Sequence, residues 1–327
     1  MRRRDFLRGG VAALGAAALS PLSVASARAV PESLMANFTP RRMVIAAGAA
    51  RPFRALHISD SHLCLVNDSD NERKHSLARS RSRIFPESEA NLKAALDYFR
   101  KNDDLLIHTG DFYDFVSEAN IDAARDFFRK ADAVFASGNH DFSQYVGEAE
   151  ENDEYKAQSV PELESTVGCR TLFSSRIVNG VNFVSLDNSY YRFKEEQFDF
   201  VRQEFARKLP VVILCHVPLY TPVALDRELV RTKGKCGYMA GVPESITSTY
   251  ETVAGRPENE KWKDRSVQQR ADKTTLKMIG WLKRQLCLKA VLCGHTHDYF
   301  AEQFSPTAMQ YIAGACYSGH GYDIDFV

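Results

Sequence analysis

Five short apolar runs in this 327-residue chain end in clusters of aspartate, histidine and asparagine, residue types that bind metal ions. The clusters read Asp60-Ser61-His62, Gly110-Asp111-Phe112-Tyr113-Asp114, Gly138-Asn139-His140-Asp141, His216-Val217-Pro218 and Gly294-His295-Thr296-His297. They contain five of the nine histidines, and scattered surface histidines would not concentrate in this way. The spacing therefore indicates one shared site.

Carboxylate, imidazole and amide ligands without thiolate suit manganese, iron or zinc better than a structural, cysteine-bound zinc. The clusters offer at least three carboxylates and five imidazoles, more than one ion needs. Two ions ~3.5–4 Å apart that share a carboxylate would use them, and such a pair activates a water for displacement at phosphorus. The residue types therefore predict a dinuclear metal site for phosphoester hydrolysis.

Each of these residues, taken singly, also has a purely structural interpretation. Asp60 or Asp111 could cap a helix that follows a strand, and Asn139 could occupy a turn beside its glycine. His216 could be a satisfied histidine of the core. The ordered set, with every member at the end of an apolar run, favours a site over these alternatives.

The remaining histidines are predicted to have supporting or surface positions. His57 and His108 lie one to three residues before candidate ligands, and we expect them to pack behind the site. His75 falls in a charged segment and is expected at the surface, while His320 is expected to lie outside the site. Asp141 could support a ligand or act as a cap.

A regular framework must position these clusters. Seven runs rich in valine, isoleucine, leucine and phenylalanine are predicted strands: Phe53–Ile58, Leu105–Ile107, Ala133–Ala136, Asn182–Leu186, Val211–Leu214, Ala290–Cys293 and Met309–Ala313. Four segments between them have helical spacing: Glu89–Arg100, Ile121–Lys130, Glu195–Lys208 and Lys273–Leu286. This alternation predicts an α/β domain, in which ligands bind beyond the carboxyl ends of the strands.

Three long polar or charged segments interrupt the alternation, near residues 66–88, 143–167 and 221–272. Long irregular segments inside a domain are usually functional loops, so we interpret these as insertions that frame the site of a single domain, residues 30–327. The first insertion carries Arg79, Arg81 and Arg83. These could bind a remote anionic group of a substrate, or they could form a solvated face.

The first 29 residues have the order of features found in an export signal. The stretch Arg3–Arg8 resembles a twin-arginine motif, a weakly apolar run follows, and Ala-x-Ala sites end at Ala27 and Ala29. The run is too short for a membrane span, and Pro21 would interrupt a helix. We expect export to the periplasm by the twin-arginine translocation machinery and no transmembrane segment in the mature chain.

The charge balance bears on possible partners. Removal of residues 1–29 takes away five arginines and one aspartate, which leaves 37 basic against 41 acidic residues from 42 of each. A mildly acidic chain has no electrostatic footprint for nucleic acid. Seven cysteines without a Cys-x-x-Cys motif argue against a complete disulfide framework, although one bridge stays possible.

In this order, the five clusters resemble the motifs of the calcineurin-like metallophosphoesterase family. The resemblance runs from Asp60 to His297 and covers most of the mature chain. It implies a four-layer αββα sandwich, in which two mixed β-sheets pack together with helices on both outer faces. It also implies hydrolysis of a phosphomonoester or phosphodiester by a hydroxide that bridges two metal ions.

The same resemblance assigns a role to each matching residue. Asp60, His62 and His297 would hold the first ion, Asp111 would bridge, and Asn139, His216 and His295 would complete the second. His140 matches the family's non-ligand histidine, which stabilises charged oxygens or protonates the leaving group. Asp114 would orient His140 by hydrogen bonding and hold it cationic.

Differences from family subgroups narrow the expected substrates. Aspartate stands at position 114 where purple acid phosphatases carry a tyrosine ligand. No Arg-Gly follows Asp114, and Asp141 stands in place of glutamate, which argues against classical Ser/Thr protein phosphatase activity. The remaining range comprises small-molecule and lipid phosphoesters, from monoesters and nucleotides to cyclic-nucleotide, nucleotide-sugar and phospholipid diesters.

Two other classes of function fit the same residues. A binding protein could retain the ions without turnover, although metal retention alone does not require the pair His140 and Asp114. A metal-dependent hydrolase could instead act on a non-phosphorus ester or lactam. A generic aryl phosphate assay separates these possibilities.

Overall fold

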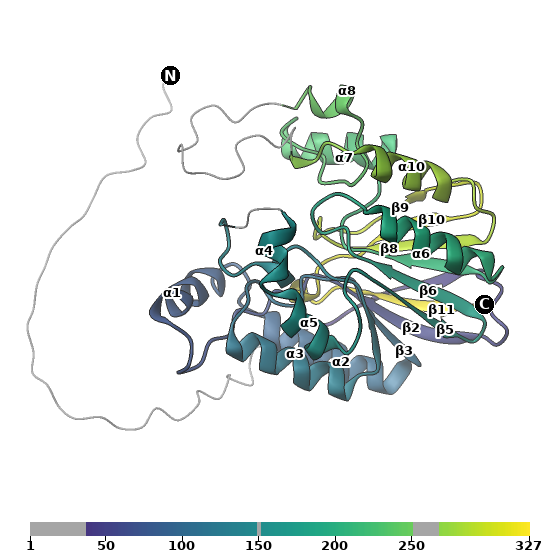
Figure 1. The fold of residues 1–327 in the computed structure, drawn as a ribbon. Coiled ribbons are helices and arrows are strands. Elements are labelled where there is room, and N and C mark those ends of the chain that lie inside the picture. Colours follow the sequence, from purple (N-terminus) through teal and green to yellow (C-terminus); the bar gives the residue numbers. More distant parts are fainter. Residues whose placement is uncertain (1–36, 149–151, 251–267) are drawn as a thin grey trace, which may run out of the picture. The chain divides into compact units, whose positions relative to one another are not determined.

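The computed structural model describes residues 37–148, 152–250 and 268–327, drawn as coloured ribbon in Figure 1. The predicted export signal, residues 1–29, lies outside the described residues, as do parts of the second and third predicted insertions. The strands are β1 (Arg41–Ile45), β2 (Phe53–Ile58), β3 (Leu105–His108), β4 (Ala133–Phe135), β5 (Phe173–Val178), β6 (Val181–Leu186), β7 (Val211–Leu214), β8 (Leu288–Cys293), β9 (Phe300–Gln303), β10 (Met309–Ile312) and β11 (Tyr322–Phe326).

Helices lie between many of these strands. They are α1 (Glu72–Arg81), α2 (Ser88–Asn102), α3 (Glu118–Lys130), α4 (Asp153–Ala157), α5 (Val160–Val167), α6 (Glu195–Ala206), α7 (Pro222–Thr232), α8 (Glu244–Thr247) and α10 (Lys273–Leu282). Two 3-10 turns, η1 (His140–Phe142) and η2 (Cys316–Ser318), complete the described elements.

The strands form two mixed sheets. One has five strands in the order β1-β11-β2-β3-β4, and the other has six in the order β5-β6-β7-β8-β10-β9. Successive side chains of a strand point to opposite faces, so each buried strand contributes to two cores. In β2, Ala55 packs between the sheets, while Leu56 and Ile58 pack on the outer side of the five-stranded sheet.

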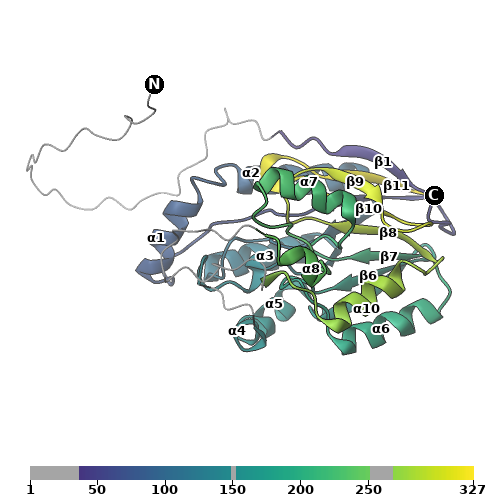
Figure 2. The same ribbon diagram turned by 90° about the horizontal axis from the view of Figure 1, so that it is seen from above.

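Helices cover both outer faces. Leu96 of α2 and Phe127 of α3 pack on the outer face of the five-stranded sheet, below it in Figure 1. Val201 of α6 and Met278 of α10 pack on the outer face of the six-stranded sheet, where the two helices lie side by side (Figure 2). The predicted fold of two mixed sheets flanked by helices is confirmed.

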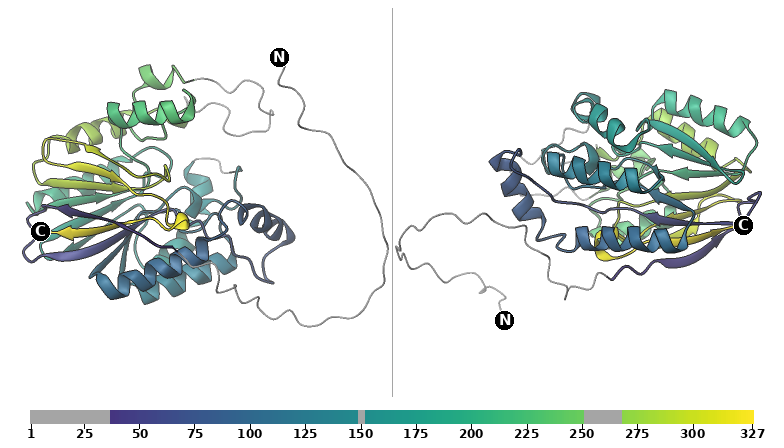
Figure 3. Two further views of the ribbon diagram at one scale, coloured as in Figure 1. Left: turned by 180° about the vertical axis from the view of Figure 1, so that it is seen from behind. Right: turned by 90° about the horizontal axis from the view of Figure 1, so that it is seen from below.

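Strand direction determines where the loops gather. Strands β2, β3 and β4 are parallel in one sheet, and β6, β7, β8 and β10 are parallel in the other. Helix α1, which follows β2, lies at the end of the sandwich opposite the C-terminus in both views of Figure 3. The loops after the parallel strands can therefore meet at this end.

The seven predicted strands are all present, with ends that differ by at most two residues. Strands β1, β5, β9 and β11 were not predicted. Three of them, β1, β5 and β9, are edge strands, and β11 carries the charged residues Asp323 and Asp325 in a five-residue run, so none has a long apolar pattern. Strands β1 and β11 pair with each other, and β11 also pairs with β2, far away in the sequence, whereas β5 and β9 pair with the strands that follow them, β6 and β10.

The three predicted insertions are more regular than the sequence indicated, because they contain α1, α4, α5, α7 and α8. In α1 the buried residues are Lys74 and Ala78, so the helix has no apolar stripe to reveal it. Side-chain caps mark the starts of two of these helices: Asn71 accepts from the Lys74 amide at α1, and Thr221 accepts from the Ala224 amide at α7.

The structure also bears on two expectations from the sequence, the absence of a transmembrane segment and of a complete disulfide framework. Among the helices of the described residues, none is long and apolar enough to cross a membrane. All seven cysteines fall in the described ranges and no disulfide joins any two of them; Cys64, Cys215, Cys236, Cys293 and Cys316 are buried. They act as small apolar residues of the core.

Candidate metal centre

Every predicted site residue lies in a loop that follows a parallel strand. The strand ends and their residues are β2 with Asp60 and His62, β3 with Asp111 and Asp114, β4 with Asn139 and His140, β7 with His216, and β8 with His295 and His297. The two sheets contribute to the same end of the sandwich, so residues up to 237 positions apart in the sequence come together.

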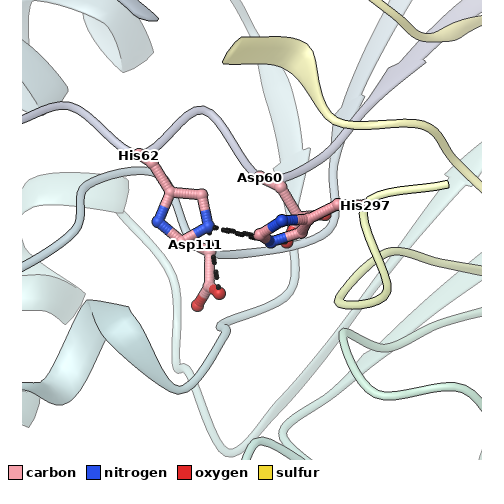
Figure 4. A group of neighbouring side chains, drawn as sticks. All are labelled: Asp60, His62, Asp111 and His297. Carbon is pink, nitrogen blue, oxygen red and sulfur yellow. Dashed lines mark hydrogen bonds and ion pairs between the residues drawn. The ribbon is translucent and has the colours of Figure 1, made fainter. Parts of the chain in front are cut away.

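Asp60, His62, Asp111 and His297 form the first group, in which one ligand atom of each lies within 4.8 Å of the others. His297 Nε2 lies 3.2 Å from Asp60 Oδ1 and 3.2 Å from His62 Nε2. His62 Nε2 lies 3.7 Å from Asp111 Oδ2. Figure 4 shows the two imidazoles pointing toward each other beside the two carboxylates, an arrangement that could hold one ion.

Asp111, His216 and His295 form the second group. His216 Nε2 lies 3.1 Å from Asp111 Oδ2 and 3.1 Å from His295 Nδ1. Asp111 Oδ2 thus lies next to an imidazole of each group. Asn139 Oδ1, in the loop after β4, is buried and has no hydrogen-bond partner among the described residues. An amide oxygen buried without a donor is destabilising, and a cation would satisfy it.

The hydrogen bonds of the His62 and His216 imidazoles indicate whether their Nε2 atoms can bind cations. His62 Nδ1 lies 3.0 Å from the carboxylate of Asp114, and His216 Nδ1 lies 2.7 Å from the carbonyl oxygen of Thr109. Both partners only accept, so the proton of each neutral imidazole is on Nδ1 and the lone pair is on Nε2. Each Nε2 then faces an oxygen of Asp111, a contact that is favourable when a cation, either a proton on the imidazole or a metal ion, lies between the two atoms.

Tyrosine hydroxyls hold the other two candidate histidine ligands. Tyr317 Oη lies 3.2 Å from His297 Nδ1, which leaves Nε2 toward the first group. Tyr191 Oη lies 2.9 Å from His295 Nε2, which leaves Nδ1 toward the second. Metal-binding histidines are usually fixed through their other nitrogen in this way, and that partner sets tautomer and ring orientation.

The backbone at the ligands is also unusual. Asp60, His62, Asp111, His295 and His297 all have positive φ, between 47° and 71°. Left-handed backbone is disfavoured for residues with a Cβ and persists where the surrounding structure enforces it. A Cβ at Gly294 would collide with the side chains of Ser59 and Asp60, so only glycine allows β8 to approach the first cluster.

His140 and Asp114 lie beside the first group, and with His62 they form a third cluster of possible ligand atoms. His140 Nδ1 lies 2.8 Å from the carbonyl oxygen of Asp114 and 3.3 Å from its carboxylate. The expected hydrogen bond between the two residues therefore forms at the backbone carbonyl oxygen of Asp114, which is nearer to His140 than the carboxylate is. Burial lowers the pKa of His140, but the carboxylates of Asp111 and Asp114 outweigh it and raise the pKa above its ordinary value.

The carboxylate of Asp114 is buried and has two other partners. One is His62 Nδ1, and the second is Arg81, whose Nε and Nη2 lie 2.6 and 2.9 Å from the two carboxylate oxygens. Arg81 belongs to α1, in the basic stretch for which anion binding or a solvated face was considered. Its side chain is directed inward to Asp114, while Arg79 pairs with Glu72 at the surface.

Buried polar groups behind the clusters support the loops. Asp141 accepts hydrogen bonds from the amides of Asp111, Phe112 and Gly138, at 2.8–3.0 Å. His57 lies 2.9 Å from Thr109 Oγ1, and His108 lies 2.9 Å from Ser61 Oγ. Burial lowers the pKa of both histidines to about 3, so they are neutral supports behind the ligand loops.

The sequence analysis did not identify Tyr191 or Tyr317, and it did not predict the contact of Arg81 with Asp114. A signal existed for Tyr191, because Asp187–Tyr191 is a polar cluster after the predicted strand β6, as at the other strand ends. Tyr317 lies in η2. This turn is held at the site because the backbone amides of Cys316 and Tyr317 donate to the carbonyl oxygens of Ser59 and Asp60, respectively. Nothing local distinguishes Arg81 from the other arginines of its segment.

A pocket of about 390 Å³ opens over both groups. Asp111, Asn139, His140, His295 and His297 lie on its floor, and the remaining wall includes tyrosines and Arg231, described below. Such a pocket admits a small molecule or the end of a larger one.

A model of the calcineurin-like phosphoesterase family matches residues 53–299. No curated protein matches the chain significantly. Solved structures similar to it include a dimetal phosphatase from Danio rerio, with 12% identity, coverage of 81% of this chain and 88% of that one, and a TM-score of 0.43. A purple acid phosphatase from yellow lupin has 14% identity and a TM-score of 0.48, over 84% of this chain and 45% of that one.

Proposed function

The chain belongs to the calcineurin-like phosphoesterase family, and on that premise we propose that it hydrolyses a phosphoester at the metal centre described above. One observation carries this proposal: Asp111 Oδ2 lies 3.1 Å from His216 Nε2 and 3.7 Å from His62 Nε2, between the two groups of ligand atoms. A carboxylate in this position suits a bridge between two cations.

In this proposal, Asp60, His62 and His297 would hold the first ion, Asn139, His216 and His295 the second, and Asp111 both. Their nitrogen and oxygen donors suit manganese, iron or zinc. When bound, the ions would supply an activated water and neutralise charge on the phosphoryl oxygens. Metal analysis of the purified protein would identify the ions.

His140 has the geometry of an acid for the leaving group. Its Nδ1 proton is directed to the carbonyl oxygen and carboxylate of Asp114, at 2.8 and 3.3 Å, so the transferable proton is on Nε2. The side chain is 19% exposed and contributes to the floor of the pocket. We therefore assign proton donation to His140, and to Asp114 the role of keeping it cationic and oriented.

A panel of phosphoesters tests the proposal on the purified chain from residue 30, with metal content measured in the same samples. We expect hydrolysis of at least one mono- or diester, loss of activity with a chelator, and recovery with manganese, iron or zinc. Metal retention without hydrolysis of any phosphoester would favour a binding protein. Hydrolysis of carboxylic esters alone would favour the non-phosphorus hydrolase.

Export by the twin-arginine pathway is a separate proposal, supported by the order of arginines, apolar run and Ala-x-Ala sites in residues 1–29. Replacement of Arg3 and Arg4 by lysine should keep the chain in the cytoplasm. Fractionation of the cells followed by N-terminal sequencing of the mature protein measures both export and the cleavage site. Unchanged export of the lysine variant would rule out the twin-arginine route.

A further inference from the structure

The wall of the pocket beyond the second group is aromatic. The rings of Tyr191 and Tyr238 lie edge-to-face against His295, each with centroids 5.6 Å apart. Both tyrosines have left-handed backbone, with φ of 66° and 50°, which is costly for bulky side chains and concentrates at functional sites. The fold thus keeps two strained residues to place these rings beside a candidate ligand.

Arg231 of α7 lies over the ring of Tyr238. Its guanidinium carbon is 5.8 Å from the centroid of the Tyr238 ring, which also contacts His295, so Arg231 and His295 are neighbours of the same aromatic ring. Among the described residues that line this pocket, Arg231 is the one with a permanent positive charge. Its side chain is 44% exposed, so a bound molecule can reach it.

A buried carboxylate fixes the orientation of Arg231. Glu228 is 1% exposed, and its Oε2 lies 2.7 Å from Nε and 2.5 Å from Nη2 of Arg231. This ion pair occupies the edge of the guanidinium formed by Nε and one hydrogen of Nη2. Nη1 and the second hydrogen of Nη2 have no hydrogen-bond partner among the described residues, so this edge can bind another acceptor. A charged group held in place by a buried partner is preorganised, which lowers the entropy lost on binding.

Arg227, one turn earlier on α7, shares the same carboxylate. Its Nη1 lies 2.9 Å from Glu228 Oε1, and its Nη2 pairs with Asp298. Glu228 therefore divides one negative charge between two guanidinium groups. Arg227 does not line the pocket, so the two arginines have the same buried partner and differ in access to the site.

We propose that Arg231 binds a second anionic group of the substrate, separated from the reacting phosphorus by a spacer about as wide as one aromatic ring. This inference rests on the proposed function and narrows the substrate class to phosphoesters that carry a further carboxylate or phosphate. The guanidinium fork suits both groups, because it can donate two parallel hydrogen bonds to either. If Arg231 only secures α7, Arg227 should be equally important.

Matched substrates test this directly. Benzyl phosphates with a para carboxylate, a para phosphonate or a neutral para carboxamide place different groups one ring beyond the ester. We expect wild-type kcat/KM to favour the anionic compounds by about tenfold, a typical effect for a charge-assisted hydrogen bond. Arg231→Met should remove the preference, and Arg227→Met should keep it. The preferred compound, carboxylate or phosphonate, identifies the anion.

A binding measurement separates this inference from the proposed function. Calorimetry with non-hydrolysable benzylphosphonates, carrying para carboxylate or carboxamide, should show the same preference in the metal-loaded protein, and its loss in Arg231→Met. If the protein binds the carboxylate compound more tightly but hydrolyses no phosphoester, the inference is upheld and the proposed function is wrong. Equal binding of the charged and neutral compounds by the wild type, or equal loss in Arg227→Met, would overturn it.

Discussion

Arg81 donates two hydrogen bonds to the carboxylate of Asp114, from Nε at 2.6 Å and from Nη2 at 2.9 Å. The acceptor is fully buried, and the same carboxylate lies 3.0 Å from His62 Nδ1. A helix in the first insertion therefore reaches a candidate ligand and the proposed acid through one shared carboxylate. The insertion is part of the site's support.

Arg81→Met should lower kcat by about tenfold to a hundredfold, the usual effect of losing a partner behind a metal ligand. The substitution leaves Asp114 buried without its permanent cation, so His62 and His140 lose their fixed orientation. Steady-state kinetics with metal analysis measures the effect. Arg79→Met is the control, because Arg79 on the same helix pairs with Glu72 at the surface. Equal losses in the two variants would contradict the role of Arg81.

His140→Ala should keep both ions and lose turnover by roughly two to four orders of magnitude, the range for general acid–base groups. In the proposed assignment His140 donates a proton and holds no ion. Metal analysis of the purified variant, next to its kcat, is the measurement. A collapse of metal content would show that His140 acts as a ligand.

Asp111→Asn should weaken the binding of both metal ions. Asp111 Oδ2 lies next to imidazoles of both groups, and a neutral amide is a poorer bridge than a carboxylate. Metal stoichiometry of the variant, measured over a range of free metal concentration, tests this. If only one ion is lost, Asp111 does not bridge.

The two tyrosine hydroxyls should act on different ions. Tyr317→Phe removes the partner of His297 Nδ1 and should lower the affinity for the first ion by about tenfold. Tyr191→Phe removes the partner of His295 Nε2 and should lower the affinity for the second ion by a similar factor. Phenylalanine keeps the ring packing, so each variant serves as the control for the other. Competition with a chelating dye measures both affinities. If the two variants lose affinity for the same ion, each hydroxyl does not act on a separate group of metal ligands.

A pH-dependent contribution to stability should come from Asp103, away from the metal centre. Burial and the neighbouring carboxylate of Asp323 raise the pKa of Asp103 to about 7, although Arg54 opposes the shift. The folded state therefore binds a proton more tightly than the unfolded chain. Its stabilising effect is complete below about pH 4 and is lost as the pH rises through about 7.

Asp103→Asn should therefore raise the free energy of unfolding at pH 8, on the order of 1–3 kcal/mol, and reduce its fall between pH 4 and 8. Urea unfolding at several pH values measures the change. Asp122→Asn, at an exposed position of α3, should leave the pH profile of the wild type unaltered. An unchanged profile for Asp103→Asn would mean that Asp103 titrates normally in the folded state.

Much of the framework and the membership of the candidate site follow from local sequence. Apolar runs identified seven of the described strands, and polar residues that follow five of them are the ones that converge. A strand buried on both faces must be continuously apolar, so its end is visible where polar residues begin. The roles of these residues remain predictions until the metal content and activity are measured.

Tertiary structure alone decided which groups surround the ligands. The orientation of each imidazole depends on a partner from a distant segment, such as Tyr317 for His297 or Asp114 for His62. Arg81 resembles any surface arginine in the sequence, because its environment arises only when α1 packs against the loop after β3. Residue type and spacing are local properties, whereas burial, hydrogen-bond partner and charge environment arise from the packing of two sheets and their loops.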